Sequence, residues 1–114
     1  MATIKVLVKD PGKAPVITEL ENTLEGLQAL IGGNIEAVSK KEMGLVMLVD
    51  EEGKIKGLPA NFIDYRLEDM IVGRAIFVGD AGDDFCDIQE QHKFAFTEIL
   101  PVTDPLYWAD RKEG

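Results

Sequence analysis

Hydrophobic and polar residues alternate along several short segments of the chain, which is the pattern of half-buried β-strands. In residues 3–9, Ile4, Val6 and Val8 occupy alternate positions, and the segment ends before the turn former Pro11. Further short segments bounded by turn residues predict strands over residues 16–20, 34–39, 45–50, 55–58 and 74–79, of which 45–49 is a continuous apolar run. Short connections join the strands over 34–39, 45–50 and 55–58. They therefore predict an antiparallel meander and argue against a doubly wound nucleotide-binding fold.

One segment between the second and third strands has the spacing of an amphipathic helix. Asn22 is a good amino-terminal cap, and Glu25 three residues later completes a pattern close to a capping box. Four apolar residues at helical spacing share one face: Leu20, Leu24, Leu27 and Ile31. The sequence predicts a helix over residues 23–31. Gly32 and Gly33 are interpreted as the end of this helix. A phosphate-binding loop is the alternative for a glycine pair, but its glycines precede a helix, and these follow one.

The second half of the chain is less regular. Residues 62–70 are ambiguous: residues 67–70 fit a loop or a helical turn, and a third helical element over about 64–70 is one interpretation. Residues 89–100 predict a second helix, although Phe94 and Phe96 alternate as in a strand. We therefore expect an α+β fold, with a mainly antiparallel sheet of five or six short strands and two or three helices packed against it. Residues 1–100 form one domain in this interpretation, and residues 101–114 form a C-terminal tail.

Composition places the chain among ordinary globular domains. It has 114 residues, of which 46% are hydrophobic, and no apolar run approaches the roughly 20 residues that a membrane helix needs. The amino terminus lacks the pattern of a secretory signal. The single cysteine, Cys86, cannot form an internal disulfide, which fits a reducing compartment. We expect a cytoplasmic protein without contact to a membrane.

The formal net charge of −9 limits the kinds of molecule that the chain is expected to bind. A negative field repels the phosphate backbone, so direct nucleic-acid binding is disfavoured. An acidic surface suits a basic partner protein, and the alternative is that the charge only maintains solubility.

Candidate catalytic and metal-binding residues are few. His92 is the only histidine and lies six positions from Cys86, so a cysteine–histidine pair competes with the commoner case of a buried structural cysteine. The densest acidic patch consists of Asp80, Asp83, Asp84, Asp87 and Glu90. It lacks the residue order of a calcium-binding EF-hand loop, which favours a solvated turn. We predict no catalytic residue, no metal ligand and no cofactor.

Candidate binding residues cluster in the irregular segment after residue 57. Asn61 offers an amide to a ligand, or alternatively bonds the backbone of its own turn. Tyr65 and Arg66 are of the residue types enriched at interface hot spots, although isolated exposed aromatics need no function. We predict Asn61, Tyr65 and Arg66 as binding residues.

Three segments resemble a known family in their order and spacing. They are Asn-Thr-Leu-Glu-Gly-Leu-Gln at 22–28, Gly-Gly-Asn-Ile-Glu-Ala-Val at 32–38 and Asp-Glu-Glu-Gly-Lys-Ile-Lys-Gly-Leu-Pro-Ala-Asn at 50–61. The family is a domain of unknown function found in small proteins of bacteriophages, prophages and plasmids, and the resemblance covers about residues 3–100. This sequence departs from the family pattern at Asn34 and in a longer stretch over 60–69. The resemblance implies an origin in a mobile genetic element and supplies no catalytic residue.

Together these observations favour a noncatalytic binding or interaction protein of a phage or other mobile element. One alternative is an inhibitor of host defence that masks a basic nucleic-acid-binding protein or sequesters a small signalling molecule. Another is a small enzyme that uses Cys86 or the acidic patch. The expected partner is a basic host protein or a small molecule, and a homodimer is left open.

Overall fold

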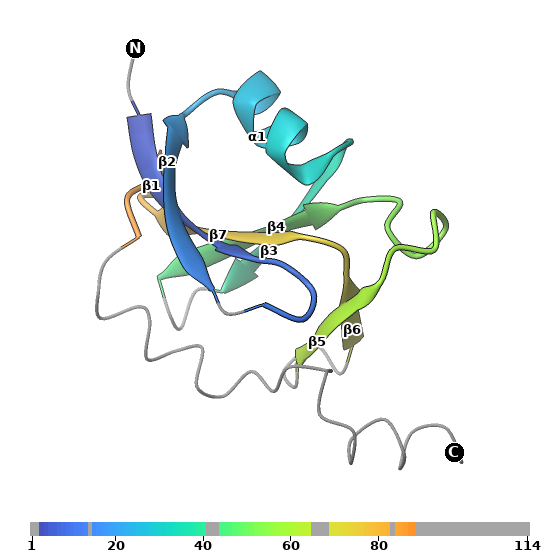
Figure 1. The fold of residues 1–114 in the computed structure, drawn as a ribbon. Coiled ribbons are helices and arrows are strands. Elements are labelled where there is room, and N and C mark those ends of the chain that lie inside the picture. Colours follow the sequence, from blue (N-terminus) through green and yellow to red (C-terminus); the bar gives the residue numbers. More distant parts are fainter. Residues whose placement is uncertain (1–2, 14, 41–43, 65–68, 83, 89–114) are drawn as a thin grey trace.

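The computed structural model describes residues 3–13, 15–40, 44–64, 69–82 and 84–88. Its elements, drawn in Figure 1, are β1 (Thr3–Lys9), β2 (Val16–Glu21), α1 (Leu24–Ile31), β3 (Ile35–Lys40), β4 (Leu45–Asp50), β5 (Ala60–Asp64), β6 (Asp69–Val72), β7 (Ala75–Asp80) and β8 (Phe85–Cys86). Among the described residues no helix has the length and apolar character that crossing a membrane requires.

Six strands form one sheet in the order β2-β1-β7-β4-β3, and β8 pairs with the end of β7. β5 and β6 form a separate two-stranded sheet, which we call the β5–β6 ribbon. Every pairing between the described strands is antiparallel. β7 lies between β1 and β4, so a late strand joins the two early hairpins β1–β2 and β3–β4 into a single sheet.

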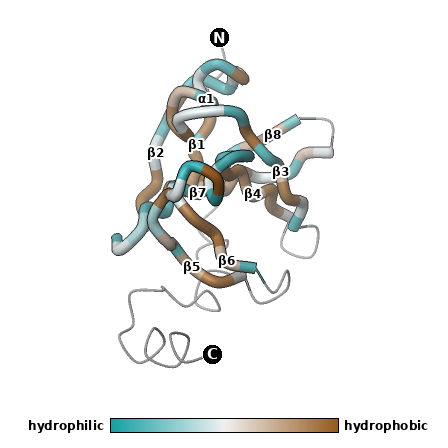
Figure 2. Tube along the Cα trace, turned by 90° about the vertical axis from the view of Figure 1, so that its right-hand side faces the viewer, coloured by the Kyte–Doolittle hydropathy of each residue, from teal (hydrophilic) through white to brown (hydrophobic). Residues whose placement is uncertain are grey.

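The two faces of this sheet carry separate hydrophobic clusters, because successive side chains of a strand point to opposite faces. Leu27 and Ile31 of α1 pack on one face, where they meet alternate residues of the central strands such as Val6 and Ile76. Phe62 and Ile71 of the ribbon pack on the other face. Figure 1 shows α1 and the ribbon on opposite sides of the sheet, and Figure 2 shows the hydrophobic stretches of the central strands and the ribbon.

The central strands β4 and β7 are buried on both faces. All six residues of β4 are buried, and its apolar run from Leu45 to Val49 contributes to both clusters in strict alternation. Continuous apolar runs are typical of strands that are covered on both sides. Each such buried aliphatic side chain stabilises the fold by roughly 1.5–3 kcal/mol. Burial of β4 and β7 therefore fixes the position of the strands around them.

The predicted first helix is confirmed, with a different cap. Thr23, and not Asn22, is the N-cap, and its side-chain oxygen accepts a hydrogen bond of 3.0 Å from the backbone N–H of Gly26. Asn22 instead points its amide toward Asp84, at 3.4 Å. Gly32 ends the helix with a φ of 92°, in the left-handed region that glycine tolerates.

The prediction of two or three helices is wrong: among the described residues α1 is the only helix, and strands dominate. The helical turn expected over 64–70 is wrong where it can be compared, because Asp69 and Met70 belong to β6. The predicted strand over 55–58 is also wrong, since residues 51–57 form a turn that leads into β5. The predicted helix over 89–100 and the tail over 101–114 lie outside the described residues. Alternation alone did not identify β5 and β6, which are short and interrupted by polar residues.

Candidate functional site

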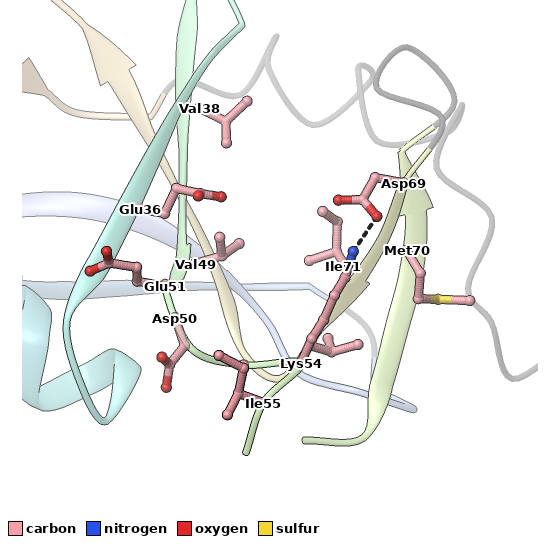
Figure 3. A pocket seen from close by; sticks show the side chains of 12 residues that line it. Glu36, Val38, Val49, Asp50, Glu51, Lys54, Ile55, Asp69, Met70 and Ile71 are labelled. Carbon is pink, nitrogen blue, oxygen red and sulfur yellow. Dashed lines mark hydrogen bonds and ion pairs between the residues drawn. The ribbon is translucent and has the colours of Figure 1, made fainter. Parts of the chain in front are cut away.

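A groove of about 270 Å³ opens on the ribbon side of the sheet, and we call it the β3–β6 groove. Its lining includes Glu36, Val38, Val49, Ile55, Asp69 and Ile71. In Figure 3, Glu36, Val38 and Val49 face Asp69 and Ile71 across it. The ribbon covers only part of this face of the sheet, and within the described residues the groove beside it is not enclosed. The site therefore has an apolar floor between two strand pairs and a charged rim.

The turn over residues 51–57 closes one end of the groove. Asp50 begins it, because its carboxylate accepts a hydrogen bond of 2.8 Å from the backbone N–H of Glu52. Backbone hydrogen bonds from Gly53 to Asp50 and from Lys56 to Glu52 then wind the chain through one helical turn. Gly57 completes it with a φ of 69°. The turn is thus held by its own hydrogen bonds and presents a fixed surface.

Two ion pairs fasten this turn to the rest of the molecule. Lys54 pairs with Asp69 of β6 across the mouth of the groove. The ammonium of Lys56 lies 2.7 Å from a carboxylate oxygen of Asp50, whose side chain is only 3% exposed. Gly33 leaves the space that this contact needs, since a Cβ atom there would stand 2.7 Å from the Lys56 ammonium. The end of α1 and the turn after β4 are therefore packed together.

The hydrogen bond from Lys56 holds the pKa of the Asp50 carboxyl below its ordinary value, and the Glu52 N–H acts in the same direction. Burial of the carboxyl opposes both effects and is outweighed. The same contact raises the pKa of Lys56. Both groups are consequently charged at neutral pH, and the pair remains intact there.

The groove carries more negative than positive charge. Four carboxylates, of Glu36, Asp50, Glu51 and Asp69, lie along it, whereas two lysines pair with Asp50 and Asp69. Within the described part of the chain, Glu36 and Glu51 have no ion-pair partner. Their charges remain available to a cation that approaches from outside.

Ile55 stands at the tip of the turn, between the two anchored lysines. Its side chain is 87% exposed, the largest exposure among the large hydrophobic residues of the described chain. An exposed isoleucine on a turn fixed at both sides adds apolar contact surface to the rim of the groove. The site thus combines an apolar tip, an apolar floor and two unpaired glutamates.

The predicted binding residue Asn61 lies away from the groove, in the interior, with no exposed surface. Its amide nitrogen donates to the backbone oxygens of Lys9 (2.7 Å) and Gly73 (2.8 Å), and its oxygen accepts from the Lys9 ammonium at 2.9 Å. These bonds join β1, β5 and the β6–β7 connection. The Asn61 amide therefore bonds groups of other segments inside the protein, and not the backbone of its own turn. Tyr65 and Arg66 lie outside the described residues.

Lys9 is a buried cation that depends on this arrangement. Its ammonium also donates to the backbone oxygen of Asp10, at 2.8 Å. Burial lowers the pKa of Lys9, and the nearby Asp10 carboxylate partly offsets that shift. The Lys9–Asn61 contact is a polar link between the main sheet and the ribbon inside an apolar environment.

The other candidate residues have local structural contacts. Cys86 is a half-buried free thiol in β8, packed against Gly79, whereas His92 lies outside the described residues. Asp80 and Asp84 accept hydrogen bonds from the backbone N–H groups of Gly82 and Phe85. Asp87 accepts one from Lys5. Over the described ranges no group of three or more histidine, cysteine or acidic residues is placed to hold a metal ion.

Sequence reasoning did not identify the groove. Its lining comes from β3, β4, the following turn and β6, and these segments meet only through tertiary packing. One signal was present in the sequence. Ile55 is an apolar residue between two lysines, in a segment that glycines bound at 53 and 57 and that therefore has the composition of a turn. Two of the segments that carry the family resemblance, 32–38 and 50–61, contribute most of its wall and rim.

Comparison with known families gives one match. The model of the family described as domain of unknown function DUF3846 matches residues 4–100, and the chain belongs to that family. Neither the curated proteins nor the solved structures that were searched contain a match.

Proposed function

We propose that this member of the DUF3846 family is a noncatalytic binding protein that holds a basic, partly apolar segment of another protein in the β3–β6 groove. The observation that carries the proposal is the pairing of an apolar floor with two unpaired glutamates on one rim. A lysine or arginine side chain matches both features, because its stem is apolar and its head is cationic. The basic partner also fits the net charge of −9.

The size of the groove supports a protein segment as the occupant. Sites for small molecules usually enclose about 300–1,000 Å³ and bury most of the ligand. At about 270 Å³ the groove lies below that range, and the described residues do not enclose it. It can accept one or two side chains of a segment that continues along the surface. Ile55, at the rim, would then contact the neighbouring residues of that segment.

The proposal can be tested with a library of random peptides selected on the immobilised protein. We expect the enriched peptides to combine lysine or arginine with aliphatic residues. The substitution Glu51→Lys should weaken binding of a selected peptide about tenfold, because it converts an attraction into a repulsion near the bound cation. Ile55→Ser should weaken the same peptide by removing apolar contact.

Glu21→Lys is the matched control, because Glu21 is an exposed glutamate of β2 at the other edge of the sheet. It changes the net charge by the same amount and should leave affinity nearly unchanged at physiological salt. Enrichment of acidic peptides would contradict the proposal. So would an equal loss of affinity in Glu21→Lys and Glu51→Lys, since only a general charge effect would then remain.

A further inference from the structure

β3 is an edge of the six-stranded sheet, and no described strand pairs with it on the side away from β4. The Glu51 N–H donates a hydrogen bond of 2.9 Å to the Asn34 oxygen, so residue 34 directs its backbone groups toward β4. Along a strand the backbone groups point to the two neighbouring sides at alternate residues. Residues 36, 38 and 40 therefore direct their backbone groups to β4. Residues 35, 37 and 39 direct theirs to the open edge, where they can pair with another strand.

The two outer strands of the sheet differ in how well they could pair with a copy of themselves. β2 carries Glu19 and Glu21 and no basic residue, and Pro15 precedes it. β3 carries Glu36 near its start and Lys40 at its end, contains no proline, and pairs with β4 without a bulge. Natural edges are commonly blunted by proline, bulges or like charges. β3 has opposite charges on one face instead.

We propose that two copies of the chain associate through antiparallel pairing of β3 with β3, with Val38 opposite the partner's Val38. This register places each Glu36 opposite the partner's Lys40, which gives two symmetric pairs of opposite charge. A register with Ala37 opposite the partner's Ala37 places Glu36 opposite the partner's Val38 and forms no charge pair, whereas one with Glu36 opposite the partner's Glu36 brings like charges together. Charge complementarity thus selects one arrangement among those that the open backbone groups allow. Lys40 also has an interaction within its own chain, to which the dimer adds a second.

The dimer would change the binding site as well as the sheet. A two-fold axis normal to a continuous sheet leaves the same face of both copies on the same side. Glu36 and Val38 line the β3–β6 groove and stand on the strand that would form the interface. The two grooves would therefore meet across the axis, and each would gain the partner's Val38 and Lys40 as part of its wall. A bound segment could then run across both copies.

Sedimentation of the full chain over a concentration series up to the millimolar range tests the association. We expect a monomer–dimer equilibrium for the wild type. Glu36→Lys and Lys40→Glu should each weaken the dimer about tenfold or more, because each turns two attractive pairs into two repulsive ones. The double variant Glu36→Lys with Lys40→Glu should recover the affinity. A wild type that stays monomeric overturns the proposal, and so does a dimer that ignores both charge reversals.

Three further variants test the register and the backbone pairing. Val38→Cys should form an intermolecular disulfide readily, since facing residues in a pair without mutual backbone hydrogen bonds lie within disulfide reach. Ala37→Cys should do so poorly, because residue 37 faces the partner's residue 39; faster cross-linking of Ala37→Cys would overturn the register. Ala37→Pro removes only an N–H that faces the open edge, so it should abolish the dimer and leave thermal unfolding of the monomer nearly unchanged.

In the dimer Glu36 pairs with the partner's Lys40, so Glu51 is the glutamate left for a bound peptide, and two variants separate the two proposals. Glu51→Lys should lose peptide affinity and keep the dimer, whereas Ala37→Pro should lose the dimer and keep a peptide-binding groove in each monomer. If Glu51→Lys also dissociates the dimer, the assigned β3 interface is wrong, because Glu51 lies outside the paired segment.

Discussion

The two faces of the six-stranded sheet are covered by elements of different kinds. On one face α1 places Leu27 and Ile31 directly on the central strands, so that a single amphipathic element closes the cluster. On the other face the β5–β6 ribbon packs Phe62 and Ile71 over the centre, and among the described residues a groove remains between the ribbon and β3. The helix face also has a hollow, lined by residues that include Ala37, Val46 and Phe85. The ribbon face combines a buried core with a groove, so the same element that stabilises the sheet also builds one wall of the candidate site.

The largest expected effect comes from removing the main contact of the ribbon. Phe62 has no exposed surface, and its ring lies 6.1 Å from that of Phe77 between centroids. Phe62→Ala should lower the free energy of unfolding by about 3–5 kcal/mol, because it leaves a cavity and removes an aromatic contact. Chemical denaturation measures this value.

Leu27→Ala provides the comparison on the helix face, and should cost about 2–5 kcal/mol. Leu24→Ala, on the 60% exposed first residue of α1, is the control and should stay within about 0.5 kcal/mol of the wild type. If Phe62→Ala cost no more than Leu24→Ala, the ribbon would not be part of the core, and the groove would lose its second wall.

A smaller effect is expected from the polar link between ribbon and sheet. Asn61→Leu removes the donor to two backbone oxygens and leaves the Lys9 ammonium with only the Asp10 backbone oxygen as an acceptor, which should cost on the order of 1–3 kcal/mol. Adding Lys9→Met removes the stranded charge, so the double variant should be more stable than Asn61→Leu alone. Denaturation of Asn61→Leu, of Lys9→Met and of the double variant gives the coupling energy. Additive losses would show that the Lys9–Asn61 bond contributes nothing specific.

The sequence predicted the helix face far better than the ribbon face. The spacing from Leu24 to Ile31 is a local signal, and so are the alternation in β1 and the apolar run of β4; each appears in the structure within one or two residues of its expected limits. The ribbon depends on the pairing of two short segments and on a bulge near Ala60. Such pairing is decided by contacts distant in sequence, and periodicity carries little information about it.

The candidate site was equally hidden, for a related reason. Asn61 was singled out because a polar residue in an irregular segment commonly serves recognition, and its burial became visible only once Lys9 was placed beside it. Glu36 and Glu51 had no feature that separated them from the other acidic residues. They acquire significance because the neighbouring Asp50 and Asp69 are paired with lysines, whereas they are not.

The smallest effect concerns acid stability, where each side of the comparison contributes one carboxylate. Asp10, whose partner Arg74 also bonds the Leu30 oxygen at the end of α1, has its pKa lowered chiefly by the Arg74 hydrogen bond. Asp50, at the groove, has its pKa lowered chiefly by Lys56. A pKa depressed in the folded state means that the unfolded chain binds protons first as the pH falls. The stabilisation is therefore present above the ordinary carboxyl pKa of about 4 and is lost below it.

Thermal unfolding between neutral pH and pH 3 should show a smaller acid-induced decrease in Asp10→Asn and in Asp50→Asn than in the wild type. The two variants should differ in which backbone amides lose protection from hydrogen exchange. Asp50→Asn loosens the turn that carries Ile55, so hydrogen exchange at residues 51–57 should rise at neutral pH, whereas Asp10→Asn should leave that exchange unchanged. Equal protection of the turn in both variants would contradict the role of the Asp50–Lys56 pair in fixing the groove. The shape of the groove would then depend on the packing of the ribbon against the sheet and not on this ion pair.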